Sequence, residues 1–498
     1  MKKYILSVDQ STSATKAVFF DENANLIARS NKEHKQFYPQ PGWVEHDPVE
    51  IYENTCHVMH DIINKAGILP GDVANLSITN QRETVVVWDK RNGKPVYNAI
   101  VWQCQRGVEI CRQLEKDGHT DLVKSKTGLI IDPYFSASGI KWILDNVEGA
   151  RQKAENGDLI CGTVDSWLIF NLTNGKVHAT DHSNACRTML YNIFDLQWDR
   201  DILNLHQIPL SMMPEVKPSN AVFGHVECRK AFPEKIQISG VMGDSHAALF
   251  GQCCFEPGLG KATYGTGSSV MMNIGKKPLI SPDGLVTSIG FSFNEDVDYV
   301  FEGNIHCTGD TIKWLVDNLQ LIDNSKESEE IATSVPDNGG VYFVPAFVGL
   351  GAPYWNNEAR ALITGMDRGA GKAHVVRAAL ESIAYQINDV VARMVSGLPI
   401  HFQELRVDGG PTRNEFLMEF QSDILNGTVE RADIEEISAL GVALMGGMSS
   451  GIWKDFKEIE GLRKSDKTYR PQMKDEERDK LCEGWKAAVE KVLVNEKI

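Results

Sequence analysis

Two apolar runs separated by a short polar turn open the chain. Residues 5–8 and 17–20 flank a turn of small hydroxyl residues that begins with one carboxylate, Asp9. Apolar runs of this length predict two paired strands. Such a turn can close its N–H groups and hydroxyls around a phosphate, and an Asp at its mouth suits a hydrated Mg²⁺. An ordinary hairpin with a capping Asp explains the same pattern.

A second pattern of the same kind follows about half a chain later. Residues 260–273 again form an apolar run, a turn of Gly, Ser and Thr, and a second apolar run. Two such hairpins predict a duplicated architecture that holds a nucleotide between its halves. The chain of 498 residues is also too long for one core of ordinary size. We therefore expect two domains, 1–252 and 253–498.

Hydrophobic periodicity predicts further elements. Asp47 and Pro48 supply an N-cap and a first-turn proline for a helix that runs to about residue 66. The longest apolar stripe at helical spacing lies between Val375 and Met394. The charged tail after residue 453 is expected to be solvated helix with a few apolar anchors. Other predicted strands cover 26–30, 76–79, 85–88, 236–242 and 405–408, and other predicted helices cover 245–253 and 414–425.

Composition and charge narrow the function classes. The chain is 42% hydrophobic and 24% charged, which is ordinary for a soluble enzyme. Its formal net charge of −16, with no long basic run, makes nucleic acid and anionic membranes poor partners. The ten cysteines are scattered without a CxxC pair, which favours reduced thiols. The chain shows no signal peptide and no membrane-spanning run, so we expect a cytoplasmic protein.

Polar and aromatic residues near strand ends are candidates for recognising a small molecule. Arg82 and Glu83 follow one predicted strand and offer several donors beside an acceptor, which suits a ligand with several hydroxyls. Trp102 and Tyr134 occupy loop positions suited to a pocket wall with a polar edge. A solvated turn would explain the charged pair equally well, and core packing is the commoner fate of a single Trp or Tyr.

Asp244 differs in kind from these residues. It ends the apolar run 236–242 and precedes a predicted helix, so it either caps that helix or points between the domains. An alcohol that attacks a phosphoryl group needs a carboxylate to accept its proton. The glycine turn at 408–410, followed by Asn414, allows close approach of a nucleotide, although such turns are common. The segment 308–310, which is equally ambiguous, could face the nucleotide from the other side.

Taken together, the segments resemble the FGGY family of carbohydrate kinases over nearly the whole chain. The resemblance implies an α/β fold of two duplicated actin-like (ribonuclease H-like) ATPase domains, with a nucleotide and substrate cleft between them. It also implies ATP and Mg²⁺ as cofactors and a homo-oligomer. The matching segments include PGWVEHDP and ITNQRET, and lie at 41–48, 78–84, 98–103, 128–136, 162–168, 187–190, 347–355 and 361–381.

The resemblance also implies a role for individual residues. Asp244 would be the catalytic base, and Asp9 would position the metal. The polyol hydroxyls and carbon face would be held by Arg82, Glu83, Trp102, Tyr134 and Asp244, with Ser245 and Ser269 lining the same pocket. The nucleotide and its transferring phosphate would be contacted by Thr12, Ser13, Lys16, Thr266, Gly267, Gly309, Lys313, Gly410 and Asn414.

This sequence departs from the members of the family that phosphorylate glycerol. Lys16 stands where Arg is common, Gly139 where a signature Lys is expected, Ser245 where Gln is usual and Ser269 where a Phe lines the substrate. The two serines predict a roomier and more polar pocket. The region 227–238 lacks the glycine-rich loop that binds fructose 1,6-bisphosphate in some members, so that regulation is not expected.

The resemblance thus implies ATP-dependent phosphorylation of a small polyol. Glycerol is the first expectation, and a longer alditol or a ketose is the alternative that the two serines raise. An actin-like or chaperone-like ATPase is a different class, which would lack a polyol pocket beside the phosphate. A sugar-sensing repressor is a further alternative, which would need a DNA-binding appendage before the first hairpin.

Overall fold

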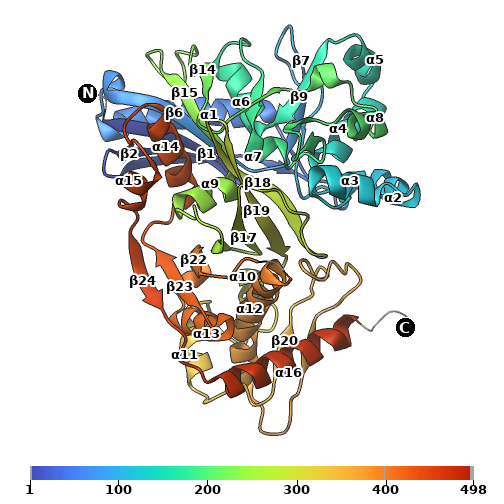
Figure 1. Cartoon of the computed structure of the whole chain (residues 1–498), viewed down its shortest axis with the longest axis vertical. Coiled ribbons are helices and arrows are strands. Elements are labelled where there is room, and N and C mark those ends of the chain that lie inside the picture. The colour runs from blue at the N-terminus through green and yellow to red at the C-terminus, as the bar shows by residue number, and fades with distance from the viewer. Residues whose placement is uncertain (1–2, 398, 494–498) are drawn as a thin grey trace.

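The computed structural model describes residues 3–397 and 399–493 and consists of two halves, each built on a large twisted sheet (Figure 1). The six-stranded sheet of the first half has the order β14-β15-β6-β1-β2-β3. Its strands are β1 (Tyr4–Gln10), β2 (Ala14–Asp21), β3 (Leu26–Glu33), β6 (Val73–Asn80), β14 (Val222–His225) and β15 (Gln237–Gly243).

A five-stranded sheet and most of the helices complete the first half. The order of this second sheet is β4-β5-β8-β7-β9. Its strands are β4 (Gln36–Phe37), β5 (Glu45–His46), β7 (Val85–Asp89), β8 (Ala99–Ile100) and β9 (Leu159–Thr163). Two small ribbons lie outside this sheet. One pairs β10 (Ala179–Asp181) with β13 (Glu215–Lys217), and the other pairs β11 (Tyr191–Asn192) with β12 (Gln197–Trp198). The helices are α1 (Pro48–Ala66), α2 (Val108–Lys116), α3 (Thr120–Thr127), α4 (Ser136–Asn146), α5 (Ala150–Glu155), α6 (Val164–Leu172), α7 (His182–Ala185), α8 (Arg200–Leu205) and α9 (Asp244–Gly251).

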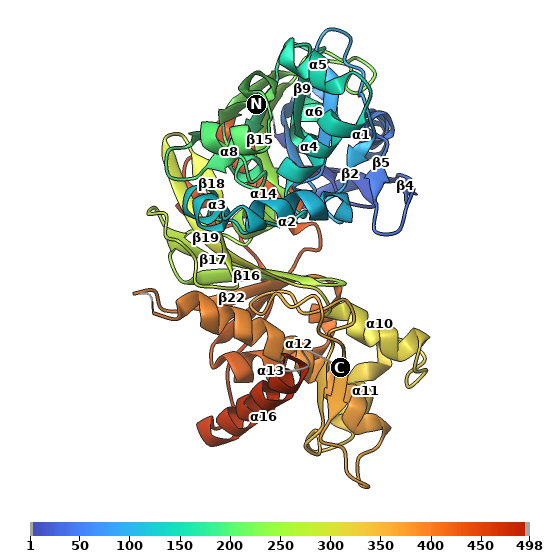
Figure 2. The same cartoon turned by 90° about the vertical axis from the view of Figure 1, so that its right-hand side faces the viewer.

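The second half is organised on a seven-stranded sheet with the order β18-β19-β17-β16-β22-β23-β24. Helices α12 (Lys372–Val395) and α13 (Glu415–Leu425) pack against this sheet (Figure 2). Helix α16 (Asp475–Leu493) packs against α13 and against a separate two-stranded ribbon. The strands are β16 (Leu259–Tyr264), β17 (Ser268–Gly275), β18 (Val286–Phe293), β19 (Asp296–Ile305), β22 (Glu404–Asp408), β23 (Thr428–Ala432) and β24 (Ser465–Tyr469), with a separate ribbon of β20 (Tyr342–Val344) and β21 (Leu362–Thr364). The helices are α10 (Gly309–Asp317), α11 (Glu327–Thr333), α12 (Lys372–Val395), α13 (Glu415–Leu425), α14 (Ile437–Ser449), α15 (Phe456–Glu460) and α16 (Asp475–Leu493).

The two large sheets repeat one topology. In the first, β1 pairs antiparallel with β2 and parallel with β6, and β6 pairs parallel with β15. In the second, β16 pairs antiparallel with β17 and parallel with β22, and β22 pairs parallel with β23. A helix follows the last strand of each series, α9 after β15 and α14 after β23. This is the duplicated actin-like (ribonuclease H-like) arrangement that the family resemblance implies.

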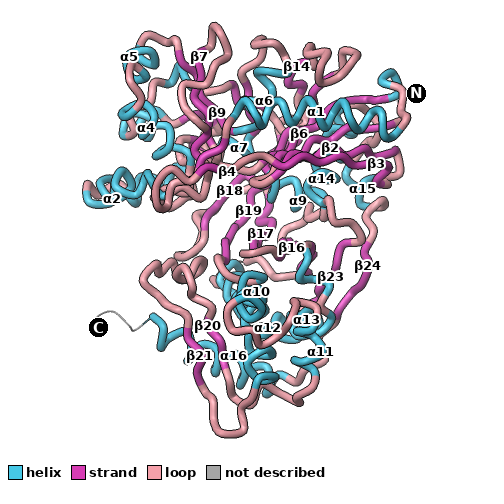
Figure 3. The backbone as a smooth tube through the Cα atoms, turned by 180° about the vertical axis from the view of Figure 1, so that it is seen from behind, coloured by secondary structure: helices cyan, strands magenta, loops and turns pink. Residues whose placement is uncertain are grey.

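Helices α9 and α14 join the halves. They pack against each other between the two large sheets, and α14 also contacts β1, β6 and β15 although it comes from the second half of the chain (Figure 3). Both helices belong to one buried apolar cluster that includes Ile5 of the first sheet and Met271 of the second. The segments that connect the halves are therefore anchored in a shared core.

Local signals account for most of the elements. Asp47 accepts a hydrogen bond from the N–H of Val49 at the start of α1, and Gly67 ends the helix with a φ of 63°. The predicted apolar stripe is confirmed as the buried face of α12. The prediction for the tail is wrong in part, because residues 465–469 form β24, an edge strand that pairs with β23. Residues 494–498 of that tail lie outside the described residues.

Two structural expectations from composition can also be compared with the structure. All ten cysteines are free thiols, seven of them buried. Across residues 3–397 and 399–493, none of the helices is both long and apolar enough to pass through a bilayer.

Candidate active site

A buried ion network crosses from the first half to the second beside the predicted substrate residues. Arg82, after β6, donates from both Nη atoms to the two oxygens of Glu302 in β19, at 3.0 and 2.9 Å. Arg187 donates to Glu83 at 2.6 Å and lies 2.9 Å from Glu302. Burial alone would raise the pKa of Glu302, but the guanidinium groups of Arg187 and Arg82 hold this pKa well below its usual range. Glu302 is therefore an anion that ties the halves together.

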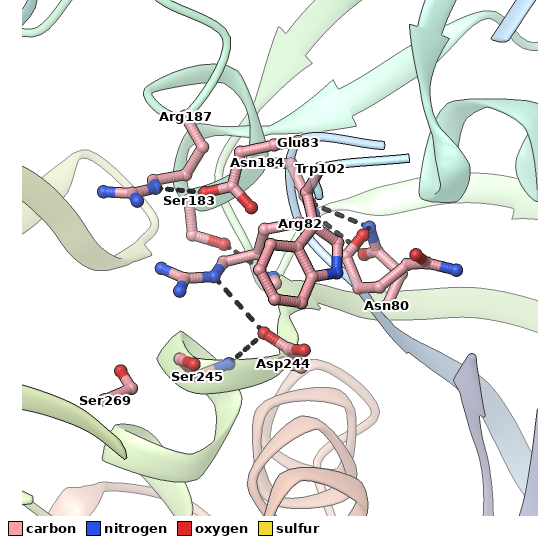
Figure 4. A network of polar contacts seen from close by, with 12 residues as sticks. Asn80, Arg82, Glu83, Trp102, Ser183, Asn184, Arg187, Asp244, Ser245 and Ser269 are labelled. Carbon is pink, nitrogen blue, oxygen red and sulfur yellow. Dashed lines mark hydrogen bonds and ion pairs between the residues drawn. The ribbon is translucent and has the colours of Figure 1, made fainter. Parts of the chain in front are cut away.

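Asp244 lies at the edge of this network. Its Oδ1 is 3.3 Å from Nε of Arg82 and accepts the N–H of Ser245 at 2.6 Å (Figure 4). Unlike the buried network, the Asp244 side chain is 35% exposed. Since Nη1 and Nη2 of Arg82 are occupied by Glu302, Arg82 orients Asp244 through Nε alone. The carboxylate is thus held at the start of α9 with part of its surface free for a ligand.

Glu83 adopts an unusual backbone conformation. Its φ is 63°, in the left-handed region that glycine favours, and the N–H of Thr84 donates to the carbonyl of Arg82 at 2.6 Å. The turn is held in place by the ion pair with Arg187 and by Ser136, which donates to the Glu83 carbonyl at 2.7 Å. Such strained turns are concentrated at functional sites. This turn directs Arg82 and Glu83 to the same group of polar side chains.

Aromatic residues form one wall beside this turn. The ring of Trp102 lies 5.4 Å from that of Tyr134 in an edge-on arrangement, and its Nε1 donates to Thr12 Oγ1 at 3.0 Å. Both rings are half-buried. The hydrogen bond therefore links this aromatic wall to the turn between β1 and β2.

The first hairpin carries the residues predicted to bind metal and phosphate. Asp9 lies opposite Lys16 in the antiparallel register of β1 and β2, and Ser13 at the turn between these strands is exposed. Burial raises the pKa of Asp9 to about 7, the Lys16 charge opposes this rise, and the charges of Asp244 and Glu436 add to it. The Oδ1 atom of Asp9 is buried and has no hydrogen-bond partner among residues 3–397 and 399–493. A buried carboxylate with an unpartnered oxygen fits a cation, so these residues suit Mg²⁺.

The predicted nucleotide residues of the second half gather around the turn between β16 and β17. The N–H of Gly309 donates to Gly265 and that of Asp310 to Thr266, at 2.9 and 3.1 Å. A Cβ at Gly267 would lie 2.4 Å from the carbonyl oxygen of Ile305, so this close approach requires glycine. These contacts place Thr266, Gly267 and Gly309 in one backbone cluster.

The remaining nucleotide candidates divide into two groups. Gly410 is exposed at the turn after β22, and Asn414 caps α13 by accepting the N–H of Leu417 at 2.9 Å. Pro411, next to Gly410, would lie 3.3 Å from a Cβ added at Gly309, so this turn adjoins the backbone cluster. Lys313 does not join it, because its ammonium pairs with Asp317 and its side chain is 68% exposed.

The positions that depart from the family pattern are placed differently from one another. Ser245 and Ser269 are both half-buried, and Ser269 Oγ lies 3.4 Å from the ammonium of Lys261, which is fully buried. Burial lowers the pKa of Lys261, while the Asp408 carboxylate opposes this fall. Gly139 instead lies in α4 against Val85 and Ile100, in an apolar core. The position at which the family signature has a lysine is therefore packed in the apolar core of this protein.

Sequence reasoning missed two members of the ion network. Arg187 falls only within the matching segment 187–190, and no sequence pattern singles out Glu302. The available signal at Glu302 is a carboxylate that directly follows the apolar run 299–301, where a charge is costly to bury without a partner. Its partners come from residues more than 100 positions away, so the sequence does not identify them.

Comparisons with known proteins decide the family. The model of the N-terminal domain of the FGGY family of carbohydrate kinases matches residues 4–251, and that of the C-terminal domain matches residues 260–450. The chain belongs to the FGGY family of carbohydrate kinases. Glycerol kinase 2 of Thermotoga maritima is 54% identical over 99% of this chain and all of its own length. A glycerol kinase of Caldanaerobacter subterraneus subsp. tengcongensis is 52% identical over 99% of both chains.

Solved structures agree with this assignment. The crystal structure of Plasmodium falciparum glycerol kinase with ADP has a TM-score of 0.94 and 39% identity, covering 99% of this chain and 98% of the other. A ligand-bound xylulose kinase from Lactobacillus acidophilus has a TM-score of 0.91 at 20% identity over 99% of both chains, which shows the shared fold alone. As a member of this family the chain is an ATP-dependent carbohydrate kinase with an alcohol as acceptor, which decides against the chaperone-like ATPase and the repressor.

Proposed function

We propose that this kinase transfers the γ-phosphoryl group of ATP to a terminal hydroxyl of a small polyol, with glycerol as the first substrate. The observation that carries the proposal is the placement of Asp244, which is partly exposed and lies 3.3 Å from the Nε of Arg82. Relatives that are more than 50% identical over nearly the full length are named glycerol kinases, which supports the same substrate.

In this proposal Asp244 is the catalytic base. It accepts the proton of the attacking hydroxyl while Arg82 and Glu83 bind the neighbouring hydroxyls and Trp102 and Tyr134 cover the carbon chain. The ion pair between Arg82 Nε and Asp244 Oδ1, at 3.3 Å, also holds this carboxylate in place beside the hydroxyl. A base within hydrogen-bond reach of a positioned alcohol contributes roughly 10²–10⁴-fold to the rate.

The nucleotide is proposed to lie between the two hairpins. Thr12, Ser13 and Lys16 contact the transferring phosphate, and Asp9 holds Mg²⁺, which when bound neutralises charge on the phosphate oxygens. The second-half group Thr266, Gly267, Gly309, Gly410 and Asn414 holds the rest of the nucleotide, with Lys313 at its exposed margin. Closure of the halves 1–252 and 253–498 on both substrates would exclude water that competes as acceptor.

A longer alditol or a ketose is the second candidate acceptor. Ser245 and Ser269 replace a Gln and a Phe of the family pattern, and the buried Lys261 ammonium lies 3.4 Å from Ser269 Oγ. These groups provide donors and space for a further hydroxyl, as in erythritol, xylitol, xylulose or ribulose. We further propose that the enzyme is a cytoplasmic homo-oligomer.

One assay tests the proposal. ADP release with MgATP is measured against glycerol, erythritol, xylitol, xylulose and ribulose, and the highest kcat/KM is expected with glycerol. A higher value for a longer acceptor would replace glycerol by the second candidate, and a flat response would remove the polyol kinase function. Asp244→Asn is expected to retain nucleotide binding and to lose at least about a hundredfold in kcat. Near-normal turnover of that variant would exclude Asp244 as the base.

A further inference from the structure

The duplicated topology places two carboxylates at equivalent positions. Asp244 is the first residue of α9, directly after β15, and Glu436 immediately precedes α14, after β23. Because β15 and β23 are equivalent strands of the repeated fold, both carboxylates lie where the chain leaves a sheet for a helix between the halves (Figure 1). Asp244 has a proposed role in the reaction, whereas Glu436 has none.

Glu436 does not serve its own helix. A carboxylate at this position normally caps the first turn by accepting a backbone N–H, but the Glu436 side chain accepts none from α14. Its Oε2 instead accepts a hydrogen bond of 2.8 Å from the Lys16 ammonium, 420 positions away in the chain. The Glu436 side chain is only 7% exposed, so this ion pair is formed at a desolvated carboxylate.

Arg29 is the second cation beside Glu436 and differs from Lys16 in its surroundings. Its Nη1 lies 3.6 Å from Oε1, and its side chain is 62% exposed. An exposed pair at that distance contributes little, because water screens it. Lys16 is therefore the principal partner of Glu436 among the described residues.

The two helices that carry these carboxylates are in direct backbone contact. A Cβ added at Gly441 of α14 would lie 1.7 Å from the carbonyl oxygen of Ala247 in α9. A Cβ added at Gly251 of α9 would lie 2.6 Å from the carbonyl oxygen of Ile437. Contacts this close leave little freedom for one helix to move against the other. Asp244 and Glu436 thus belong to one rigid unit.

We propose that Glu436 is a positioning residue for phosphoryl transfer, which holds the Lys16 ammonium in a fixed place relative to Asp244. The inference rests on the proposed role of Lys16 at the transferring phosphate. Lysine is a flexible point charge with three donors, and a fixed acceptor for one of them restricts the other two. A charge that is already in place when negative charge develops stabilises the transition state without reorganisation.

The primary test compares Glu436→Gln with the wild-type enzyme at saturating polyol. Because Gln leaves the Lys16 ammonium without its anionic partner, kcat is expected to fall about tenfold. The KM for ATP is expected to stay constant or decrease, because a negative charge near the triphosphate has been removed. Arg29→Gln is the matched control and is expected to keep both constants. Equal losses in the two variants, or a rise in the KM for ATP with unchanged kcat, would overturn the proposal.

A double-mutant cycle separates positioning from a structural role. Lys16→Met is expected to lower kcat, and adding Glu436→Gln to it is expected to cause no further loss, because Glu436 acts through Lys16. An undiminished effect of Glu436→Gln in the Lys16→Met background would overturn the proposal. A wild-type kcat for Lys16→Met would instead refute the proposed role of Lys16 itself. If Glu436→Gln does not fold, Glu436→Asp, which keeps the charge but is one methylene shorter, takes its place in the cycle.

Discussion

Arg82 and Glu302 form a bidentate ion pair between the two halves of the kinase, with both oxygens of Glu302 accepting from Arg82 at 2.9 and 3.0 Å. Arg187 lies 2.9 Å from the same carboxylate, and all three side chains are almost fully buried. A desolvated anion between two guanidinium groups keeps all three charges paired, and the same Arg82 orients Asp244. The network therefore links stability to the geometry of the proposed base.

Glu302→Gln is the first prediction. The change leaves Arg82 and Arg187 with one compensating charge fewer, and breaking a buried pair of this kind costs about 3–5 kcal/mol. We expect a Tm lower by roughly 5–10 °C in thermal unfolding, together with a lower kcat. Asp296→Asn is the control, because the Asp296 carboxylate pairs with Lys276 on the exposed surface and its loss should change Tm very little. Equal Tm shifts in the two variants would contradict the interpretation.

Asp9 predicts a dependence of stability on pH. A carboxyl whose folded-state pKa is raised to about 7 contributes most to stability below its unfolded pKa near 4, and this contribution is lost as the pH rises through 7. Without nucleotide or metal, Asp9→Asn is therefore expected to be more stable than the wild type at pH 8. The difference should shrink as the pH falls from 7 towards 4. Thermal unfolding between pH 4 and pH 8 measures it, and a constant difference would show that Asp9 is not the titrating group.

The same variant has a second readout. If Asp9 holds the metal, Mg²⁺ with nucleotide should raise the Tm of the wild type at pH 8 and should raise that of Asp9→Asn much less, because a neutral amide is a weaker ligand for a hard cation. Equal stabilisation of the two proteins would place the metal on other residues.

The two serines predict a shift in acceptor preference. Ser269→Phe with Ser245→Gln refills the pocket and removes two hydroxyls, so kcat/KM for glycerol relative to erythritol should rise about tenfold. Ser334→Phe, at an exposed residue after α11, is the control for the added ring. A ratio that is unchanged or falls in the double variant would show that these positions do not face the acceptor.

The sequence predicted the parts of this kinase that depend on local patterns. The hairpin around Asp9, the cap of α1 and the stripe of α12 follow from spacing and turn chemistry over a few residues. The pairs Arg82–Glu302 and Lys16–Glu436 could not be predicted, because their partners are 220 and 420 positions apart. The strand β24 was missed for a related reason, since its charged residues form an edge that becomes a strand only by pairing with β23.

The close contact of α9 with α14 gives the last prediction. Gly441→Ala places a methyl group where the Ala247 carbonyl oxygen and the Gly251 nitrogen now lie, at 1.7 and 2.8 Å from the added carbon. Since both atoms belong to backbone, the helices must separate, which moves Asp244 and Glu436 relative to each other. We expect a lower Tm and a loss of at least about tenfold in kcat, because small misplacements of reacting groups are costly. Gly71→Ala is the matched control, since its added carbon meets only the end of a flexible Glu234 side chain at 3.9 Å. A lower Tm with unchanged kcat would show that the helix contact stabilises the fold without setting the position of the base.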